Sequence, residues 1–167
     1  MALRRIDPPT RIGPVRRAYV AFLRTPPGRW IALHIAPRVD PFLLRHSGGR
    51  VGLGMMLPSA VLETTGAKSG TPRECTVLYF HDARDVILIA SSYGRSANPA
   101  WYHNLVAHPD CVLGDDRFRA EQIDEPGERA RVWSLADRVY AGYADYRTRA
   151  ATSGREIPLL RLKGLSG

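Results

Sequence analysis

The sequence predicts one α+β domain built on an antiparallel sheet or small barrel. Three observations lead to this prediction. Short apolar runs rich in β-branched residues, separated by turn residues, fill the middle of the chain. Helical segments broken by prolines precede them, and a longer stretch of helical spacing comes near the end. Strands that follow one another through hairpins, with helices at the ends and one helix inserted between strands, favour an antiparallel sheet or small barrel.

Residues 1–50 are expected to be a helical lead-in to the sheet, which occupies residues 51–167 of the same structural domain. Helices are predicted at residues 15–24, 28–36 and 40–45, and prolines separate them because proline cannot continue a helix. Glycines within residues 48–54 mark a flexible connection to the first strand. The lead-in alternates arginines with apolar side chains, a pattern typical of helices on an anionic membrane surface and also of helices packed on their own domain.

Strands are predicted at residues 60–65, 74–81, 86–91, 111–113, 117–123 and 157–162. Residues 82–85 are expected to close a hairpin. A short helix begins at Pro99 with Asn98 as its N-cap and runs to His108, since proline suits the first helical position. From residue 126 to about 149 the helical spacing predicts one long helix. The apolar stripe of that helix is Val132, Ala136, Val139 and Tyr143.

Composition excludes several classes of protein. Cys75 and Cys111 are far apart and have no CxxC companion, and the five histidines contain no HExxH pair, so neither a disulfide framework nor a metal site is expected. The free thiols fit a reducing cytoplasm. No secretory leader is expected from the N-terminal residues, and no apolar run reaches the roughly 20 residues that a bilayer requires. The net charge of +8 attracts anions, whether nucleic acid, anionic lipid or a phosphorylated small molecule.

A glycine-rich loop between the first two strands is the first candidate site. It comprises residues 64–73, Thr-Thr-Gly-Ala-Lys-Ser-Gly-Thr-Pro-Arg. Glycines allow a tight turn whose N–H groups face an anion, and Lys68, Ser69 and Arg73 supply charge and hydrogen bonds. The loop lacks the first glycine of a Walker A motif. Taken alone, the pattern fits either an anion site or a hairpin turn with solvated charges.

The second candidate is the end of the third strand, Ala90-Ser91-Ser92-Tyr93-Gly94, with the helix that follows. Small residues at a strand end let a planar ring approach the backbone, and a helix start offers free N–H donors. The aromatic residues Trp101 and Tyr102 in that helix also fit a role as core anchors.

Together these segments resemble the deazaflavin-dependent nitroreductase family, also called deazaflavin-linked quinone reductases, a branch of the split β-barrel flavin-binding proteins. The resemblance spans residues 14–162 and rests on residues 65–73, 90–92 and 99–104. It implies coenzyme F-420, with Lys68, Ser69 and Arg73 on its phosphate and glutamate tail. The cofactor-binding residues so implied are Ala67, Lys68, Ser69, Arg73, Glu74, Cys75, Thr76, Val77, Leu78, Ala90, Ser91, Ser92, Tyr93, Ala100, Trp101, Tyr102, His103 and Asn104.

Two positions depart from the family pattern: Ala67 stands where Arg or Lys is usual, and Glu74 where an apolar residue is usual. The predicted long helix carries Tyr140, Tyr143 and Tyr146, which spread over one broad face and fit a core stripe. In the family a tyrosine-rich wall of this helix faces the acceptor. The resemblance therefore implies that these tyrosines and Ser92 are the catalytic residues.

The function so implied is transfer of a hydride from reduced coenzyme F-420 to a quinone-like or nitroaromatic acceptor, in the cytoplasm or on the cytoplasmic face of a membrane. One alternative is a protein that binds or carries the cofactor without turnover, and another is an FMN-dependent reductase on the same barrel. A nucleic-acid-binding domain has only the charge in its favour, because no recognition motif accompanies it, so no nucleic acid partner is expected. The residues leave the acceptor and the oligomeric state open.

Overall fold

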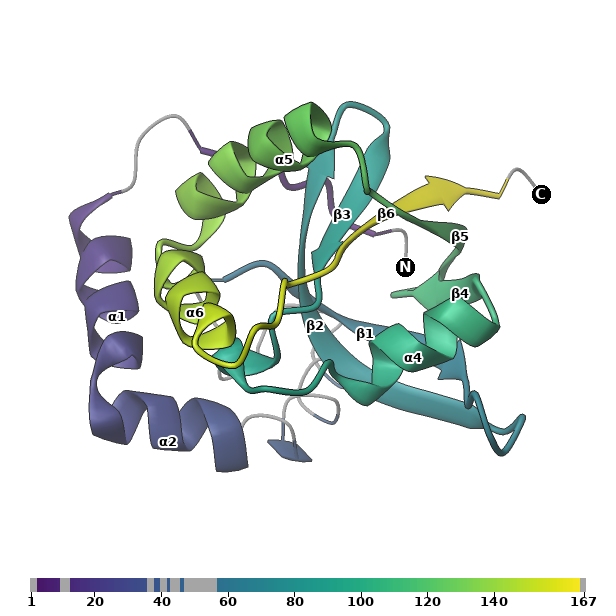
Figure 1. The fold of residues 1–167 in the computed structure, drawn as a ribbon, viewed down its shortest axis with the longest axis horizontal. Helices are drawn as coiled ribbons and strands as arrows, with labels where there is room; N and C mark the ends of the chain where they lie inside the picture. Colours follow the sequence, from purple (N-terminus) through teal and green to yellow (C-terminus); the bar gives the residue numbers. More distant parts are fainter. Residues whose placement is uncertain are drawn as a thin grey trace.

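The computed structural model describes residues 3–9, 13–35, 38–39, 42, 46 and 57–165. Six strands form a closed antiparallel barrel in the order β1-β2-β3-β6-β5-β4 (Figure 1). They are β1 (Ser59–Thr65), β2 (Pro72–Asp82), β3 (Asp85–Ile89), β4 (Asp110–Leu113), β5 (Asp116–Gln122) and β6 (Leu159–Gly164). The helices are α1 (Pro14–Arg24), α2 (Pro26–His34), α4 (Ala100–Ala107), α5 (Pro126–Val139) and α6 (Gly142–Ala151), with the short 3-10 helix η1 (Ser92–Gly94). The predicted α+β barrel is confirmed.

Side chains alternate along every strand between the barrel interior and its outer face. One buried cluster takes side chains from all six strands and fills the interior, with Leu62, Tyr79, Leu88, Leu113 and Leu162 among its members. This alternation follows from the two-residue period of a strand. Because so much apolar surface is removed from water inside the barrel, hydrophobic burial holds the strands that carry the candidate site.

A second cluster lies on the outer face of the barrel, beneath helices. Phe80, Ile87 and Leu159 meet the apolar sides of α5 and α6 there, and Val20 of α1 joins from outside. Figure 1 shows α1 beside α6, on the side of α6 away from the barrel. The guanidinium of Arg24 holds this arrangement through hydrogen bonds of 2.7 and 3.0 Å to the carboxylate of Asp145. The protein therefore has three layers in this region: barrel, α5–α6 and α1.

Most predicted elements lie within two residues of the observed ones, and the hairpin turn at residues 83–84 is confirmed. The helix predicted at 28–36 begins earlier, at Pro26, because the hydroxyl of Thr25 accepts the N–H of Gly28 and caps it. The helix predicted at 40–45, the glycine connection at 48–54 and the boundary at residue 50 lie outside the described residues.

The prediction of one long helix from 126 to 149 is wrong. The chain leaves the helix at Tyr140, whose backbone is extended (φ −150°, ψ 103°), and starts again at Gly142. The ring of Tyr140 folds back over Gly142, where a Cβ atom would lie 2.4 Å from the phenol oxygen. Glycine at this position thus lets α6 start beneath the ring, and the break turns the tyrosines toward one another.

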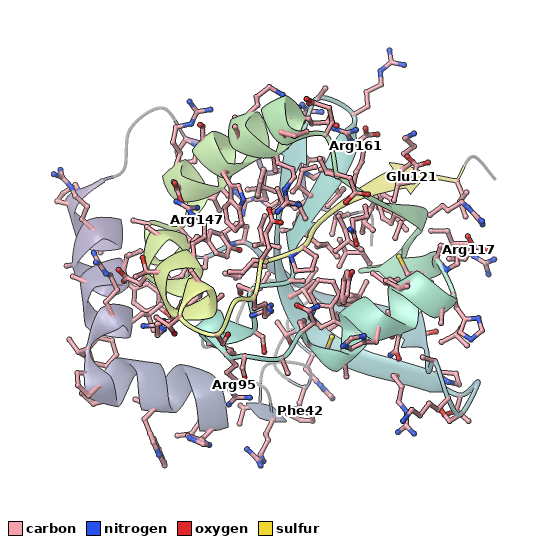
Figure 2. The ribbon with its side chains drawn as sticks, viewed as in Figure 1. Phe42, Arg95, Arg117, Glu121, Arg147 and Arg161 are labelled. Carbon is pink, nitrogen blue, oxygen red and sulfur yellow. The ribbon has the colours of Figure 1, made fainter. Side chains whose placement is uncertain are left out.

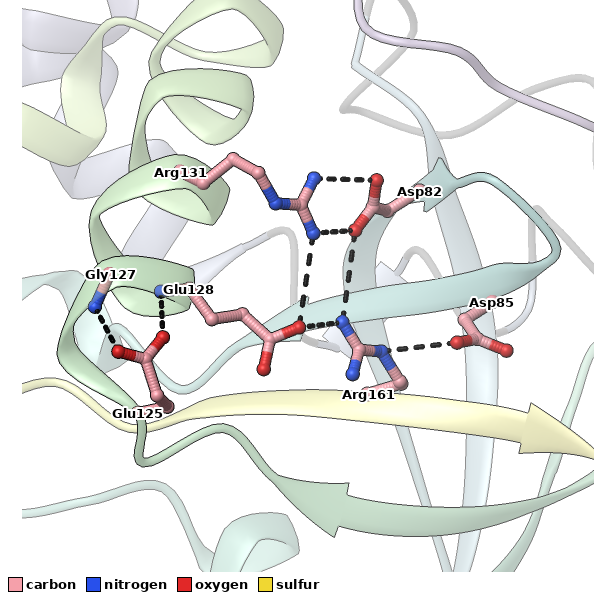
Figure 3. Close-up of polar contacts among 7 residues, drawn as sticks. All are labelled: Asp82, Asp85, Glu125, Gly127, Glu128, Arg131 and Arg161. Carbon is pink, nitrogen blue, oxygen red and sulfur yellow. Dashed lines mark hydrogen bonds and ion pairs between the residues drawn. The ribbon is translucent and has the colours of Figure 1, made fainter.

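A network of ion pairs fastens α5 to the barrel (Figure 3). The Arg131 guanidinium donates to both oxygens of Asp82 at 2.9 and 2.5 Å, which holds the pKa of that carboxyl below its usual range. Arg161 of β6 bonds to Glu128 and lies 3.1 Å from Asp85. The Glu125 carboxylate caps α5 by accepting the N–H groups of residues 127 and 128. Together these contacts set α5 at a fixed place on the barrel.

Residues 3–9 form a strap across the barrel, which the prediction of a helical lead-in did not include. The N–H of Ile6 donates to Nδ1 of His81 at 3.0 Å, and the N–H of His81 donates to the carbonyl of Ile6 at 2.7 Å. Tyr79 donates its hydroxyl to the carbonyl of Arg4 at 2.8 Å, and Leu3 N–H bonds to Asp116 at 2.6 Å. The strap therefore ties β2 to the β4–β5 hairpin.

We expect the melting temperature to fall as the pH drops below about 6.5, and the fall to continue through the lower folded-state pKa of His81. Burial lowers the pKa of His81 below its ordinary 6.5. Nδ1 can accept the Ile6 N–H only when it is unprotonated. The stabilising contribution is thus complete above the unfolded pKa and is lost on acidification. His81→Gln keeps an acceptor that does not titrate, so its pH profile should be flatter in thermal melts; identical profiles would contradict the assignment.

Candidate cofactor and acceptor site

The glycine-rich loop closes the hairpin between β1 and β2. Gly66 donates its N–H to the carbonyl of Thr71 at 2.9 Å, and Gly70, at φ +65°, donates to the carbonyl of Gly66 at 2.8 Å. The hydroxyls of Ser69 and Thr71 lie 2.8 Å apart. The loop is thus a compact, hydrogen-bonded turn, as its glycines predict.

The charged side chains of this loop point into solvent. Lys68, Ser69 and Arg73 are exposed, and within the part of the chain that the structure describes neither Lys68 nor Arg73 forms an ion pair. Two cations held 5 residues apart on a rigid hairpin can share one anionic group such as a phosphate. The donor set of the loop therefore fits an anionic tail.

Asn104 of α4 fixes the loop from below. Its Oδ1 accepts the N–H of Ala67 at 3.0 Å, and its Nδ2 donates to Oγ1 of Thr64 at 3.0 Å. Asn104 is buried, with 9% of its surface exposed. Both ends of the amide are thus engaged within the protein, so Asn104 acts on a ligand through the position of the loop.

The strand after the loop, β2, divides its predicted cofactor-lining residues between two faces. Cys75 and Val77 point into the barrel interior, whereas Glu74, Thr76 and Leu78 alternate onto the outer face. Oγ1 of Thr76 is buried and has no hydrogen-bond partner among the described residues. A buried hydroxyl without a partner is costly, so this atom suits a polar group of a bound ligand.

Neither cysteine is a candidate nucleophile. Burial raises the pKa of Cys75 and of Cys111 to about 12. Only the thiolate is a good nucleophile, and at neutral pH these thiols stay protonated. Cys75 can therefore line a site only through its backbone or as an apolar side chain.

The end of β3 runs into a strained turn. Ser92 and Tyr93 have φ values of 47° and 57°, and Gly94 follows at φ 76°. A left-handed conformation costs roughly 1 to 3 kcal/mol for a residue other than glycine, and it persists only where the surroundings impose it. Two arginines surround this turn: Arg149 donates to the carbonyl of Tyr93 at 3.3 Å, and Arg155 binds several of its carbonyl oxygens. No role for either arginine is predicted from the sequence.

The three predicted acceptor tyrosines form one buried cluster. Their ring centroids lie 5.3 to 6.1 Å apart, and the hydroxyls of Tyr140 and Tyr146 are 3.1 Å apart. Tyr146 also contacts the ring of Tyr93 in the strained turn, at 5.9 Å between centroids. The turn that carries Ser92 and the tyrosine cluster are therefore neighbours, as one site requires.

The tyrosine cluster is enclosed. Only 3%, 2% and 8% of the surfaces of Tyr140, Tyr143 and Tyr146 are exposed, and Val20 of α1 packs on the same cluster. Burial raises the pKa of all three phenols, so they are neutral donors at physiological pH. Arg147, labelled in Figure 2, locks α6 to α5 through hydrogen bonds of 2.9 and 2.8 Å to Asp137 and through stacking on Trp133.

Helix α4 completes the wall between the loop and β5. Trp101 is half-buried against the barrel interior, and Tyr102 donates its hydroxyl to Oε1 of Gln122 at 2.7 Å, while Ala100 and His103 are exposed. The predicted cap is wrong: Pro99 occupies the N-cap position, and the Asn98 side chain instead accepts the Nε–H of Arg155 at 2.6 Å. Asn98 is thus committed to a distant partner that the local sequence does not reveal.

Comparisons with known proteins agree with this geometry. The chain matches the F420H(2)-dependent quinone reductase family over residues 37–163. An F420H(2)-dependent quinone reductase of Mycobacterium tuberculosis (strain H37Rv) is 33% identical over 146 residues, covering 80% of this chain and 95% of that protein. Among solved structures, an F420-H2 dependent reductase (FDR-A) is 31% identical with a TM-score of 0.54, covering 64% of this chain and 94% of that one.

A second solved structure, described as a domain-swapped dimer, is 27% identical with a TM-score of 0.57, and covers 82% of this chain and 99% of its own. The family match spans well over half of the chain and includes the loop, the strained turn and the tyrosine cluster. The protein therefore belongs to the F420H(2)-dependent quinone reductase family.

Proposed function

We propose that the protein transfers a hydride from reduced coenzyme F-420 to a quinone, the reaction after which its family is named. The observation that carries the proposal is the order of features along β2. The cationic loop lies at one end of the strand. In the register of β2 with β3, Tyr79 stands opposite Leu88, and two more residues along the same register would bring Val77 opposite Ala90. Arg73, at the loop end of β2, and Val77 are four residues apart, which in a strand corresponds to roughly 13 Å. This spacing suits a ligand with an anionic tail and a planar ring.

The residues present fit the cofactor. Lys68, Ser69 and Arg73 would hold the phosphate and the acidic tail, and the outer face of β2 with the turn 90–93 would lie along the ring. The unpartnered hydroxyl of Thr76 supports this placement, since a polar edge of the ring would give it a partner. When bound and reduced, the deazaflavin supplies a hydride from its ring carbon and so favours two-electron chemistry.

The chain's own contribution is to bind and orient the acceptor and to exclude water. The hydroxyls of Tyr140 and Tyr146 hydrogen-bond to each other, which leaves one phenol proton to donate. That phenol and the hydroxyl of Ser92 would donate hydrogen bonds to the acceptor oxygen, which stabilises the charge that develops there during transfer. Because the three phenols are buried, an acceptor would reach them only when a neighbouring element such as α1 shifts or when it enters beside the half-buried Ser92. Orientation and exclusion of water supply the remaining acceleration.

The test mixes purified protein with reduced cofactor and menadione, and follows cofactor reoxidation by absorbance. Reoxidation that requires the protein, and that reduced FMN does not support, is the expected result; a nitroaromatic compound serves as a second acceptor. Tight binding without turnover would favour the carrier alternative instead. Turnover with FMN but not with the deazaflavin would favour an FMN-dependent reductase.

We propose in addition that α1 and α2 rest on an anionic lipid surface, from which a lipid-soluble quinone could reach the site. Large apolar side chains are exposed on these two helices, which we call the arm: Val15 (65%), Phe22 (45%) and Trp30 (57%). Phe42, beyond α2 in the chain, is 61% exposed (labelled in Figure 2). Residues 8–39 contain six arginines and no Asp or Glu. Exposed aromatic side chains with surrounding arginines are typical of interfacial helices. No helix in the described part of the chain is long and apolar enough to cross a bilayer.

Sedimentation with vesicles tests this contact. The protein should pellet with vesicles that contain phosphatidylglycerol and much less with phosphatidylcholine alone, and Phe22→Ser combined with Trp30→Ser should reduce pelleting. Val106→Ser is the matched control, because Val106 is 63% exposed on α4, away from the arm. Equal pelleting by the double variant and the wild type would contradict a role for these side chains.

A further inference from the structure

Arg155 lies in the segment between α6 and β6, and its guanidinium faces the connection from β3 to α4. Nε donates to Oδ1 of Asn98 at 2.6 Å, and Nη1 donates to the carbonyls of Ser91 at 3.1 Å and Arg95 at 2.7 Å. Nη2 donates to the carbonyl of Ala90. All four acceptors are neutral oxygens. Within the described part of the chain Arg155 forms no ion pair, and its guanidinium donates hydrogen bonds to backbone and amide oxygens instead.

These four acceptors span the whole connection from the end of β3 to the start of α4. That connection contains the left-handed residues Ser92 and Tyr93, and it is held internally only by short-range bonds such as Gly94 N–H to the carbonyl of Ser91 at 2.9 Å. Without the contact to Arg155, the carbonyl groups of residues 90, 91 and 95 would be free to point in different directions along the turn. A planar guanidinium with five donors fixes their directions relative to one another.

We propose that Arg155 is a positioning residue for the cofactor: it holds residues 90–98 in the conformation that lines the deazaflavin ring before the cofactor arrives. The inference rests on the proposed function, because it assigns a purpose to this turn. A turn that is already ordered loses little conformational entropy on binding, so more of the contact energy is kept as affinity. Arg155 touches neither the cofactor nor the acceptor in this role and acts through Ser91 and Asn98.

Arg129 provides the matched control. Arg129 is also an arginine, and 14% of its side chain is exposed. It donates to the carbonyls of Ile123 at 3.0 Å and Ile157 at 3.1 Å and to the carboxylate of Glu156 at 2.5 Å. It fastens the same segment between α6 and β6 but contacts nothing in residues 90–98. Replacing either arginine should therefore lower the stability of the protein, whereas only replacing Arg155 should change the geometry of the turn.

The experiment compares wild type, Arg155→Gln, Arg155→Lys and Arg129→Gln in two assays. Hydrogen exchange in the cofactor-free proteins follows the amides of Gly94 and Arg95, which bond within the turn. Fluorescence titration gives the cofactor Kd, and steady-state kinetics give the KM for reduced cofactor and for menadione. We expect Arg155→Gln to exchange faster at these amides and to bind cofactor at least tenfold more weakly, with a smaller rise in the KM for menadione, because Ser92 of the same turn is proposed to contact the acceptor.

Arg155→Lys should recover part of the affinity, since one ammonium can reach some of the carbonyls, and Arg129→Gln should melt at a lower temperature with a cofactor Kd within twofold of wild type. Unchanged exchange and affinity in Arg155→Gln, or equal losses of affinity in both glutamine variants, would overturn the assignment. Failure of the wild type to bind the deazaflavin would overturn the proposed function as well, while the exchange data would still report whether Arg155 orders the turn.

Discussion

Replacing Lys68 by alanine should weaken binding of coenzyme F-420 about tenfold at low salt. Lys68 extends from the exposed hairpin loop with Arg73 nearby, and neither has an ion-pair partner among the described residues. A hydrogen bond to a charged group contributes about 1.5 to 3 kcal/mol, and solvent exposure puts Lys68 at the low end. Titration of the cofactor, followed by fluorescence, measures the change. The effect should shrink at 0.5 M salt because mobile ions screen exposed charges.

Lys163→Ala is the control for this prediction. Lys163 is the only other lysine in the chain, and on β6 it pairs with Glu121 at 2.7 Å, so it changes net charge equally without touching the loop. Its cofactor Kd should remain within twofold of wild type. Equal losses in both variants would show that overall charge attracts the cofactor, and no loss in Lys68→Ala would remove Lys68 from the site.

The strands were predictable because their signals are local. Turn residues bound both the segment 60–65, in which β1 buries one side chain in two, and the continuous apolar run 86–89, which β3 buries on both of its faces. The hairpin at residues 83–84 and the loop at 66–71 close neighbouring strands over a few residues. Short connections leave antiparallel pairing as the only ready solution, so the barrel follows from the order of its strands.

The elements that sequence reasoning missed depend on distant partners. The strap at residues 3–9 has no strand-like alternation and takes its shape from bonds to His81, Tyr79 and Asp116. The break before α6 had one local signal, Gly142, which is a poor helix former. That signal is readable only once the ring of Tyr140 is known to lie on the glycine.

The residues of the candidate site also divide into those with a local sequence signal and those that depend on distant partners. Motif residues such as Lys68, Ser69 and Ser92 were identified because a loop and a strand end can be recognised from a short stretch of sequence. Arg149 stands 56 residues from the carbonyl that it binds, and Arg155 stands 60 to 65 residues from its three carbonyls, so no neighbouring residue in the chain indicates these contacts. The sequence therefore predicts which groups meet a ligand, and the tertiary structure shows which groups hold the predicted residues in place.

Gly94→Ala should be among the most damaging single substitutions in the protein, lowering the free energy of unfolding by roughly 2 to 5 kcal/mol. Two costs combine. An alanine at φ +76° adopts a left-handed conformation, which costs about 1 kcal/mol or more relative to glycine. Its Cβ would also lie 2.8 Å from the carbonyl oxygen of Tyr146 and 2.9 Å from Cβ of Arg149, and such overpacking costs about 1 to 3 kcal/mol. Denaturant unfolding measures the sum.

Gly154→Ala separates the two costs. Gly154 has nearly the same backbone angle, φ +71°, but a Cβ there would meet nothing within 4 Å, so only the conformational cost of about 1 kcal/mol applies. In Gly94→Ala, relief of the clash must push the turn away from α6, which separates Tyr93 from Tyr146 and displaces Ser92. Cofactor affinity should therefore fall in Gly94→Ala and stay unchanged in Gly154→Ala. Equal destabilisation of the two variants would mean that the turn and α6 are not in close contact in solution.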